Sequence, residues 1–234
     1  MSDGNLIFNK GACIGIIGES GSGKTELLKT ISGTQDMIPG IVGGSVKYFL
    51  NEEQEYSVYF KKNGKYYLNK NHHEVKRDFI GFIPQDPKSY LNPYWTIRKI
   101  FKESYKIKSR DVEFEQFLSN YLNQVDIDYN KYQNKYPHQL SGGESQRVMV
   151  ALVLSKEPSL IIADESTTGL DVTRQKTIID TFKKIFLIPL LHLSNTWVQH
   201  DDTMGCWIGA IKASCLKVKL CSSIFGHITL LQCV

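Results

Sequence analysis

A glycine-rich loop that ends in a lysine and a threonine is the strongest chemical signal in the chain. Residues 18–25 read GESGSGKT and match the phosphate-binding pattern G-x-x-x-x-G-K-[ST]. In such a loop the backbone N–H groups point at phosphate oxygens, at a helix N-terminus whose dipole favours negative charge. We expect Lys24 to neutralise the β- and γ-phosphates of a nucleotide and the Thr25 hydroxyl to ligate Mg²⁺. The residues expected to bind the nucleotide are Gly18, Glu19, Ser20, Gly21, Ser22, Gly23, Lys24 and Thr25.

Two adjacent carboxylates supply the complementary chemistry. Asp164 and Glu165 follow the apolar run LIIA at residues 160–163, which predicts a buried central strand. Because α/β folds bind ligands at the carboxyl ends of such strands, we expect Asp164 to hold Mg²⁺ through water. Glu165 is expected to orient and deprotonate an attacking water. An acidic pair after a strand is more often a solvated strand end, and the phosphate loop upstream is what favours the functional interpretation.

A second anion site is expected in QLSGGESQR, residues 139–147. Ser141, Gly142 and Gly143 stand at the start of an apolar helix, where free N–H groups and a hydroxyl can bind phosphate. One nucleotide does not need two phosphate-binding sites in one chain. The pattern therefore predicts that this second site binds a nucleotide held by another subunit.

The elements that must position these residues alternate between strands and helices, which predicts an α/β fold. Asn63 and Gly64 supply the pair with positive φ that a tight hairpin turn needs. The expected segments are a strand, loop and helix over residues 12–31 that open a parallel sheet, antiparallel hairpin structure over 45–70, a helical insertion over 96–139, a helix over 144–155, a strand over 160–163 and a helix over 172–185.

The missing secretory pattern predicts a cytoplasmic protein, and the weak net charge gives no indication of nucleic acid, while membrane surfaces and acidic partners remain open. The 234 residues suffice for one large α/β domain, and a net charge of +4 with 22% charged residues is too weak to indicate nucleic acid. A run of basic residues with tyrosines among them could suggest nucleic-acid contact, but turn-flanking lysines are usually a solvated edge. The run consists of Lys61, Lys62, Lys65, Lys70, Lys76 and Arg77. The sequence shows neither a secretory signal pattern nor the roughly 18 consecutive apolar residues of a transmembrane helix. Five cysteines without paired spacing predict free thiols rather than a zinc site or a disulfide framework.

Four motifs in this order resemble the nucleotide-binding subunit of ABC transporters, especially the ATPases of oligopeptide, dipeptide and nickel importers. They are GESGSGKT, FIPQDPKSYLNP, YPHQLSGGESQRVMVA and ADESTTGLDV, and the resemblance covers about residues 5–185. It implies a P-loop NTPase core with an antiparallel β segment and a helical subdomain. It also implies that Gln85 contacts Mg²⁺ or the attacking water and that Asp171 lies at a dimer seam. Ser141 and Gly143 would reach the γ-phosphate bound by the opposite subunit.

By the same resemblance the chain is expected to bind ATP and Mg²⁺ and to couple ATP hydrolysis to the uptake of a peptide, nickel or a related solute. Two ATPase subunits, identical or different, would hold ATP between them, with membrane permease subunits as partners and an extracellular solute-binding protein as an indirect one. The chain would lie at the cytoplasmic face of the membrane as a peripheral subunit. The expected divisions are a nucleotide-binding core with an antiparallel β segment at 5–95, a helical subdomain ending in the second anion site at 96–143, a return to the core at 144–185, and an atypical tail at 186–234.

Both ends of the chain depart from the family pattern. Only 17 residues precede Gly18, and Phe8 stands too close to it to be the aromatic residue that stacks on adenine in the family. Residues 186–234 hold two acidic residues and four of the five cysteines, and the family's continuation is not recognisable there. One hypothesis is a reading frame disrupted near residue 186, which makes an ATP-binding remnant with impaired or no hydrolysis the alternative function. A soluble ATPase acting on nucleic acid or ribosomes is disfavoured, because neither tandem cassettes nor a long coiled-coil insertion is present.

The switch histidine of the family has two candidates, and neither satisfies the whole pattern. His200 stands beside Asp201 at close to the family's spacing from Glu165, but the preceding residues SNTWVQ are not an apolar strand. His192 follows the strand-like run FLIPLL but comes too early. Sequence alone leaves both open, and neither is included among the expected site residues.

Overall fold

The computed structural model divides into two compact units. The first comprises residues 1–82, 159–164 and 189–234, and the second comprises 83–158 and 165–188. The boundaries expected from sequence at 95, 143 and 185 stay predictions. The residues that the structure describes are 4–9, 13–17, 22–34, 41, 43–49, 55–107, 111–164, 205–210, 215–220 and 229–233.

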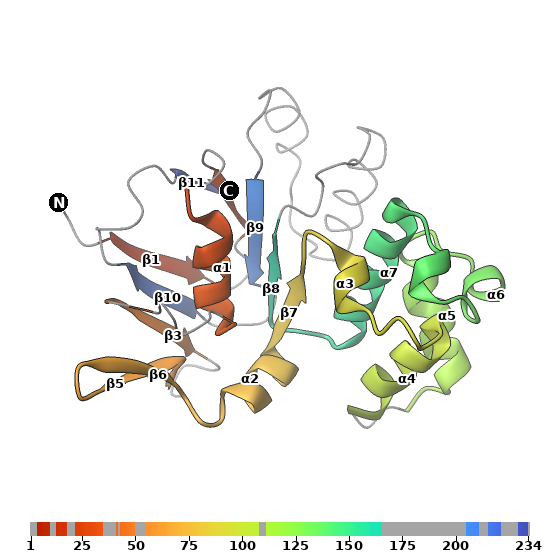
Figure 1. The fold of residues 1–234 in the computed structure, drawn as a ribbon, viewed down its shortest axis with the longest axis horizontal. Coiled ribbons are helices and arrows are strands. Elements are labelled where there is room, and N and C mark those ends of the chain that lie inside the picture. Colours follow the sequence, from red (N-terminus) through yellow and green to blue (C-terminus); the bar gives the residue numbers. More distant parts are fainter. Residues whose placement is uncertain are drawn as a thin grey trace. The chain divides into compact units, whose positions relative to one another are not determined.

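A five-stranded sheet belongs to the first unit. Its strand order is β11-β2-β9-β8-β7, with β9 beside β8 (Figure 1). β2 and β8 each pair antiparallel with β9, so they run in the same direction and end at the same edge of the sheet. All four residues of β8 are buried, as the apolar run predicts. The strands are β2 at Cys13–Ile17, β7 at Ile80–Ile83, β8 at Leu160–Ala163, β9 at Gly205–Ala210 and β11 at Thr229–Cys233.

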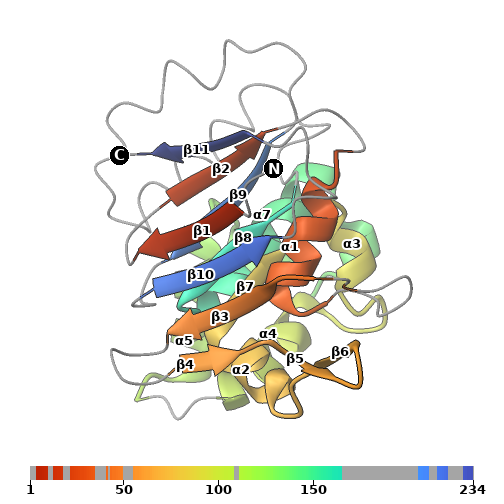
Figure 2. The same ribbon diagram turned by 90° about the vertical axis from the view of Figure 1, so that its left-hand side faces the viewer.

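An antiparallel sheet and a separate hairpin also belong to the first unit. The sheet order is β1-β10-β3-β4, and Figure 2 shows these strands side by side. β5 and β6 form the two-stranded hairpin. Its turn residues Asn63 and Gly64 have φ of 51° and 76°, which confirms the expected tight turn. The strands are β1 at Gly4–Asn9, β3 at Ser45–Phe49, β4 at Glu55–Ser57, β5 at Tyr59–Lys62, β6 at Lys65–Leu68 and β10 at Cys215–Leu220.

Helix α1, Lys24–Ser32, follows the phosphate loop and contributes much of the core of the first unit. Leu27, Leu28 and Ile31 recur at helical spacing and are fully buried. They form one cluster with apolar side chains of β3, β7, β8 and helix α2, His72–Phe79. The strand and the helix expected on either side of the phosphate loop are therefore confirmed.

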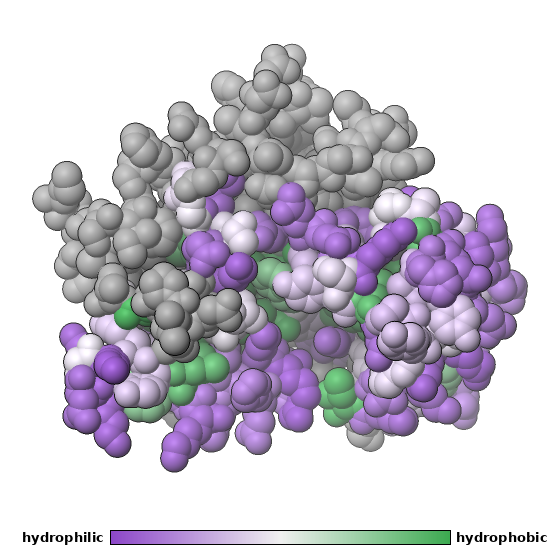
Figure 3. Space-filling view, viewed as in Figure 1, coloured by the Kyte–Doolittle hydropathy of each residue, from purple (hydrophilic) through white to green (hydrophobic). Residues whose placement is uncertain are grey.

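The second unit is helical, as expected for residues 96–139. α4 and α5 each bury one apolar face, and both contact α7. Hydrophilic side chains cover much of the face of α4, α5 and α6 that Figure 3 presents. None of the helices in the described part of the chain combines the length and the apolar character needed to cross a membrane. The helices are α3 at Pro87–Tyr90, α4 at Ile97–Ile107, α5 at Phe114–Asn123, α6 at Tyr129–Tyr132 and α7 at Gly142–Ser155, with a 3₁₀ turn at Pro137–Gln139.

Several elements lie where none was expected from the sequence. β1 precedes the phosphate loop, α2 follows the hairpin, and the tail supplies β9, β10 and β11. β10 is hydrogen-bonded between β1 and β3, and β9 between β2 and β8, so the tail contributes to both sheets. Such short strands give little local signal, because cross-strand neighbours decide whether they form. The helix expected over 172–185 lies outside the described residues.

Candidate functional site

The N-terminus of α1 presents the described part of the phosphate loop. Gly23 is the N-cap, with a φ of 93° that favours glycine, and no side chain of the described residues caps the helix there. Lys24, the first residue of the helix, is 4% exposed. A buried ammonium beside uncapped helix N–H groups is suited to an anion such as a phosphate. The loop residues Gly18, Glu19, Ser20 and Gly21 lie outside the described residues, and their contacts stay predictions.

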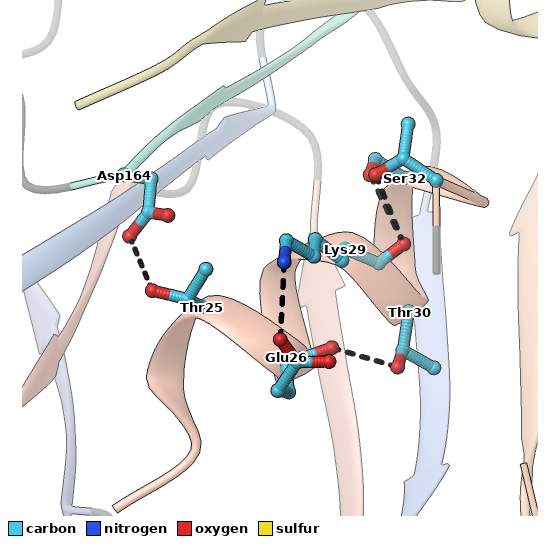
Figure 4. A network of polar contacts seen from close by, with 7 residues as sticks. Thr25, Glu26, Lys29, Thr30, Ser32 and Asp164 are labelled. Carbon is cyan, nitrogen blue, oxygen red and sulfur yellow. Dashed lines mark hydrogen bonds and ion pairs between the residues drawn. The ribbon is translucent and has the colours of Figure 1, made fainter. Parts of the chain in front are cut away.

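The two expected magnesium ligands Thr25 and Asp164 meet beside this helix end. The Thr25 hydroxyl donates a hydrogen bond to Oδ1 of Asp164 at 3.1 Å, across 139 positions of sequence (Figure 4). Asp164 directly follows β8 and is 5% exposed. β2, which leads into the phosphate loop, and β8 end at the same sheet edge, because both pair antiparallel with β9. A hydroxyl and a carboxylate are therefore in contact where the sequence predicts a cation.

The polar groups around Thr25 fit a magnesium nucleotide. Mg²⁺ takes oxygen ligands and usually binds one or two protein groups together with substrate phosphates and water. Thr25 and Asp164 offer two such oxygens, and Lys24 offers a cation for the phosphates. The Ser22 hydroxyl is buried without a hydrogen-bond partner among the described residues. Since buried hydroxyls are normally paired, this group is consistent with a ligand that completes the site.

Gln85 stands in the second unit, two residues after β7 ends. Its side chain is exposed at the start of a turn. In this turn Oδ1 of Asp86 accepts a hydrogen bond from the Lys88 N–H at 3.2 Å and so caps α3. Gln85 is thus presented on the surface of its unit by a capped turn. Its contact with Mg²⁺ or the attacking water stays a prediction.

Ser141 begins α7 with a reciprocal capping box. Its hydroxyl accepts a hydrogen bond from the Glu144 N–H at 3.3 Å, and Oε2 of Glu144 accepts one from the Ser141 N–H at 2.8 Å. Ser141 and Gly142 are exposed, and a Cβ added at Gly142 would meet nothing within 4 Å. Gly143 is buried in the first turn of the helix. The residues expected to form the second anion site therefore share one helix N-terminus that has room for an outside ligand.

Tyr132 and Glu144 support this helix end and were missed in the sequence interpretation. The Tyr132 hydroxyl donates to Oε1 of Glu144 at 2.5 Å, and the bonds from Tyr132 and Ser141 lower the pKa of Glu144 to about 2. Glu144 therefore stays ionised at neutral pH and accepts both bonds. The Ser-x-x-Glu spacing of a capping box identifies Glu144 in the sequence. No local pattern identifies Tyr132, because the contact depends on how α6 packs.

The change Glu144→Gln is expected to lower the free energy of unfolding at neutral pH by about 1 kcal/mol, because one amide oxygen replaces two acceptors. The folded-state pKa lies below the ordinary value, so this stabilisation is present above pH 4.5 and lost as the pH falls toward 2. Urea unfolding of both proteins should therefore give a difference that shrinks as the pH falls from about 4.5 toward 2. Glu113→Gln is the control, because Glu113 stands at the N-cap of α5 without a side-chain cap. A difference independent of pH would contradict the ionised capping box.

Known proteins resemble the chain over most of its length. Residues 1–168 match the family model described as ABC transporter. The oligopeptide transport ATP-binding protein OppD of Lactococcus lactis subsp. cremoris is 36% identical over 186 residues, which cover 78% of this chain and 52% of that protein. The metal-staphylopine import system ATP-binding protein CntD of Staphylococcus aureus is 33% identical over 215 residues, covering 87% of this chain and 71% of that protein. The chain spans about half the length of the curated oligopeptide relatives it matches.

Solved structures share the fold. The ATP-binding cassette MJ0796, in a post-hydrolysis dimer bound to ADP and Pi, has a TM-score of 0.52 at 24% identity, covering 72% of this chain and 67% of that one. The protein cbiO1 from Clostridium perfringens has a TM-score of 0.51 at 22% identity, covering 73% of this chain and 61% of that one. At these identities the likeness concerns the fold alone. It confirms the α/β P-loop architecture expected from the sequence motifs.

Proposed function

Because the chain belongs to the ABC transporter family, we propose that it is an ATP-binding subunit that hydrolyses ATP to drive the import of a solute. The observation that carries the proposal is the contact between the Thr25 hydroxyl and the Asp164 carboxylate, beside the buried Lys24. These groups supply a cation for phosphates and two oxygens for Mg²⁺ at a helix N-terminus.

In the proposed mechanism the phosphate loop holds ATP and orients its γ-phosphate. Backbone N–H groups of residues 18–23 and the Lys24 ammonium bind the phosphate oxygens. Thr25 and Asp164, with Gln85 by the family resemblance, would hold Mg²⁺, which would neutralise charge on the phosphates. Glu165, which lies outside the described residues, orients the attacking water and takes its proton. Positioning and charge neutralisation supply most of the rate of the in-line attack.

A second ATPase subunit, identical or different, completes each nucleotide site in this proposal. Ser141, Gly142 and Gly143 would bind the γ-phosphate held by the partner, and Asp171 would lie at the seam. The exposure of Ser141 and Gly142 supports this role, because an anion from outside the chain can approach them. The Ser141 hydroxyl accepts its bond from Glu144, so its own proton is able to reach a phosphate oxygen.

The solute and the membrane partners are proposed from the names of the relatives. One relative is named for oligopeptide transport and another for metal-staphylopine import. We therefore propose uptake of a peptide, nickel or a related solute, through membrane permease subunits that receive it from an extracellular binding protein. The chain would act as a peripheral subunit at the cytoplasmic face of the membrane. Identifying the membrane subunits that co-purify with it would test this assignment.

The rival function is an ATP-binding remnant that does not turn over. The observation that favours it is the composition break after residue 185, which led to the hypothesis of a disrupted reading frame. Titration with ATP and a steady-state hydrolysis assay on the purified chain separate the two functions. Turnover supports the ATPase, and binding without turnover supports the remnant. If the measured mass of the native protein includes residues 186–234, the hypothesis of a disrupted reading frame is wrong.

The change Glu165→Gln is expected to keep ATP affinity within about threefold and to lower turnover by at least about 100-fold, because the amide cannot accept the proton of the attacking water. Equilibrium titration and steady-state phosphate release measure the two quantities. Glu74→Gln, at an exposed position of α2, is the matched control and should leave both unchanged. Unchanged turnover in Glu165→Gln would remove Glu165 from its proposed role.

A further inference from the structure

The C-terminal end of α1 is closed by side chains from outside the helix. The last four carbonyl groups of an α-helix have no partner within it. In α1 the Lys29 carbonyl accepts a hydrogen bond from the Thr34 N–H at 2.9 Å. The Thr30, Ile31 and Ser32 carbonyls accept hydrogen bonds from the Tyr59 hydroxyl at 3.0 Å, the Tyr48 hydroxyl and the His72 Nε2 at 2.9 Å, respectively.

The three donors come from three separate elements of the first unit. Tyr48 lies on β3, Tyr59 on β5 and His72 on α2, and they are 0%, 7% and 1% exposed. Rings of Tyr48 and His72 both stack on Tyr56, with centroids 6.2 Å and 6.1 Å apart. Burying a hydroxyl or an imidazole is costly unless it is hydrogen-bonded. These bonds therefore fix where the end of α1 lies against β3, β5 and α2.

The donors keep their protons at neutral pH. Burial raises the pKa of the Tyr48 and Tyr59 hydroxyls. Burial lowers the pKa of His72, and since a carbonyl only accepts, Nε2 carries the single proton of the neutral ring. A Cβ at Gly33 would lie 2.0 Å from this Nε2, so glycine at the helix end leaves the space that the ring occupies.

The other end of the same helix carries Lys24 and Thr25. Nine residues of α-helix are about 13 Å long, so a tilt of about 5° around the held end moves the first residue by about 1 Å. Displacements of this size at groups that position a substrate are costly for binding and turnover. A helix fixed at its C-terminal carbonyls thus keeps its N-terminal phosphate ligands in place.

We propose that Tyr48, Tyr59 and His72 are positioning residues for nucleotide binding, which act by holding the C-terminal carbonyls of α1. The inference rests on the proposed nucleotide function. The three residues contact the C-terminal end of the helix, whereas the proposed phosphate ligands lie at its N-terminal end. The three residues act through the helix on Lys24 and Thr25.

Three tyrosine changes that each remove one hydroxyl give a graded test. Tyr48→Phe should weaken binding of ATP with Mg²⁺ about threefold to tenfold, because it leaves the Ile31 carbonyl without this donor. Tyr59→Phe should have a smaller effect, about twofold to threefold, because the Thr30 carbonyl keeps the Gly33 N–H. Tyr56→Phe is the matched control from the same ring stack. The Tyr56 hydroxyl has no partner among the described residues, so its removal should leave affinity unchanged.

The imidazole offers a rescue experiment. His72→Leu removes the donor to the Ser32 carbonyl and should weaken ATP binding about threefold to tenfold. His72→Gln keeps an N–H near the same position and should restore most of the affinity. Leu118→Ala, at a fully buried position of α5, should lower Tm while leaving the affinity for ATP unchanged. Affinities are compared at a temperature well below every Tm.

If Tyr48, Tyr59 and His72 only stabilise the fold, the experiments should give a different result. If Tyr48→Phe and His72→Leu lower Tm but bind ATP as tightly as the unchanged protein, the positioning role is wrong. If the unchanged protein does not bind ATP, the nucleotide proposal fails, and amide hydrogen exchange of α1 without nucleotide decides the inference. Faster exchange over residues 24–32 in Tyr48→Phe and His72→Leu, but not in Tyr56→Phe, supports the held helix. Equal exchange in all of these proteins overturns it.

Discussion

Replacing Lys24 by alanine is expected to weaken ATP binding by at least about 100-fold. The Lys24 side chain is 4% exposed at the first turn of α1, where helix N–H groups are the other donors for a phosphate. Removing the ammonium would take away the cation that we propose neutralises the β- and γ-phosphates in this buried place. Equilibrium titration with ATP and Mg²⁺ measures the loss.

Lys29→Ala is the matched control for this change. Lys29 lies on the same helix, but its side chain is 38% exposed and its ammonium pairs with Glu26 at 3.1 Å (Figure 4). An exposed ion pair of this kind contributes little to stability, and Lys29 itself lies in the last turn of the helix. Affinity for ATP should therefore stay within about twofold in Lys29→Ala. Binding by Lys24→Ala that matches Lys29→Ala would contradict the phosphate site.

The change Asp164→Asn is expected to lower ATP turnover by at least about 1,000-fold. Asparagine keeps an Oδ1 acceptor for the Thr25 hydroxyl, so the contact between the two residues is retained. It loses the negative charge with which Asp164 would hold Mg²⁺. Turnover measured across a range of Mg²⁺ concentrations should therefore stay low and respond weakly to the metal.

Asp78→Asn provides the comparison in the same unit. Asp78 is 49% exposed and pairs with Arg77, so its charge lies on the surface. Turnover and its dependence on Mg²⁺ should match those of the unchanged protein. The role of Asp164 would be refuted by an Asp164→Asn protein that hydrolyses ATP with the unchanged dependence on Mg²⁺.

Local sequence patterns were sufficient to predict the residues that stand at the ends of strands and helices. The apolar run at 160–163 predicts a buried strand, and the rule that ligands lie at the carboxyl ends of strands places Asp164 near the phosphate loop. The contact with Thr25 bears out this reasoning over a large sequence separation. Asn63 and Gly64 predict the hairpin turn because few residues tolerate positive φ.

Contacts between elements could not be predicted in the same way. Tyr48 and Tyr59 stand in segments expected to be strands, but nothing local shows that their hydroxyls meet the end of α1. The segment around His72 is mostly polar and gives no apolar helical pattern, because only two side chains of this short helix are buried. The strands of the tail have the same difficulty, since distant partners decide their pairing.

The position of β9 has a consequence for the order in which the protein matures during synthesis. The strand that leads into the phosphate loop and the strand that delivers Asp164 are not hydrogen-bonded to each other, because β9, Gly205–Ala210, lies between them. A nascent chain that has emerged only as far as Asp164 carries both strands without the one that joins them. Since domains fold as their residues leave the ribosome, the contact between Thr25 and Asp164 is expected to form late in translation, after the chain has grown past residue 210.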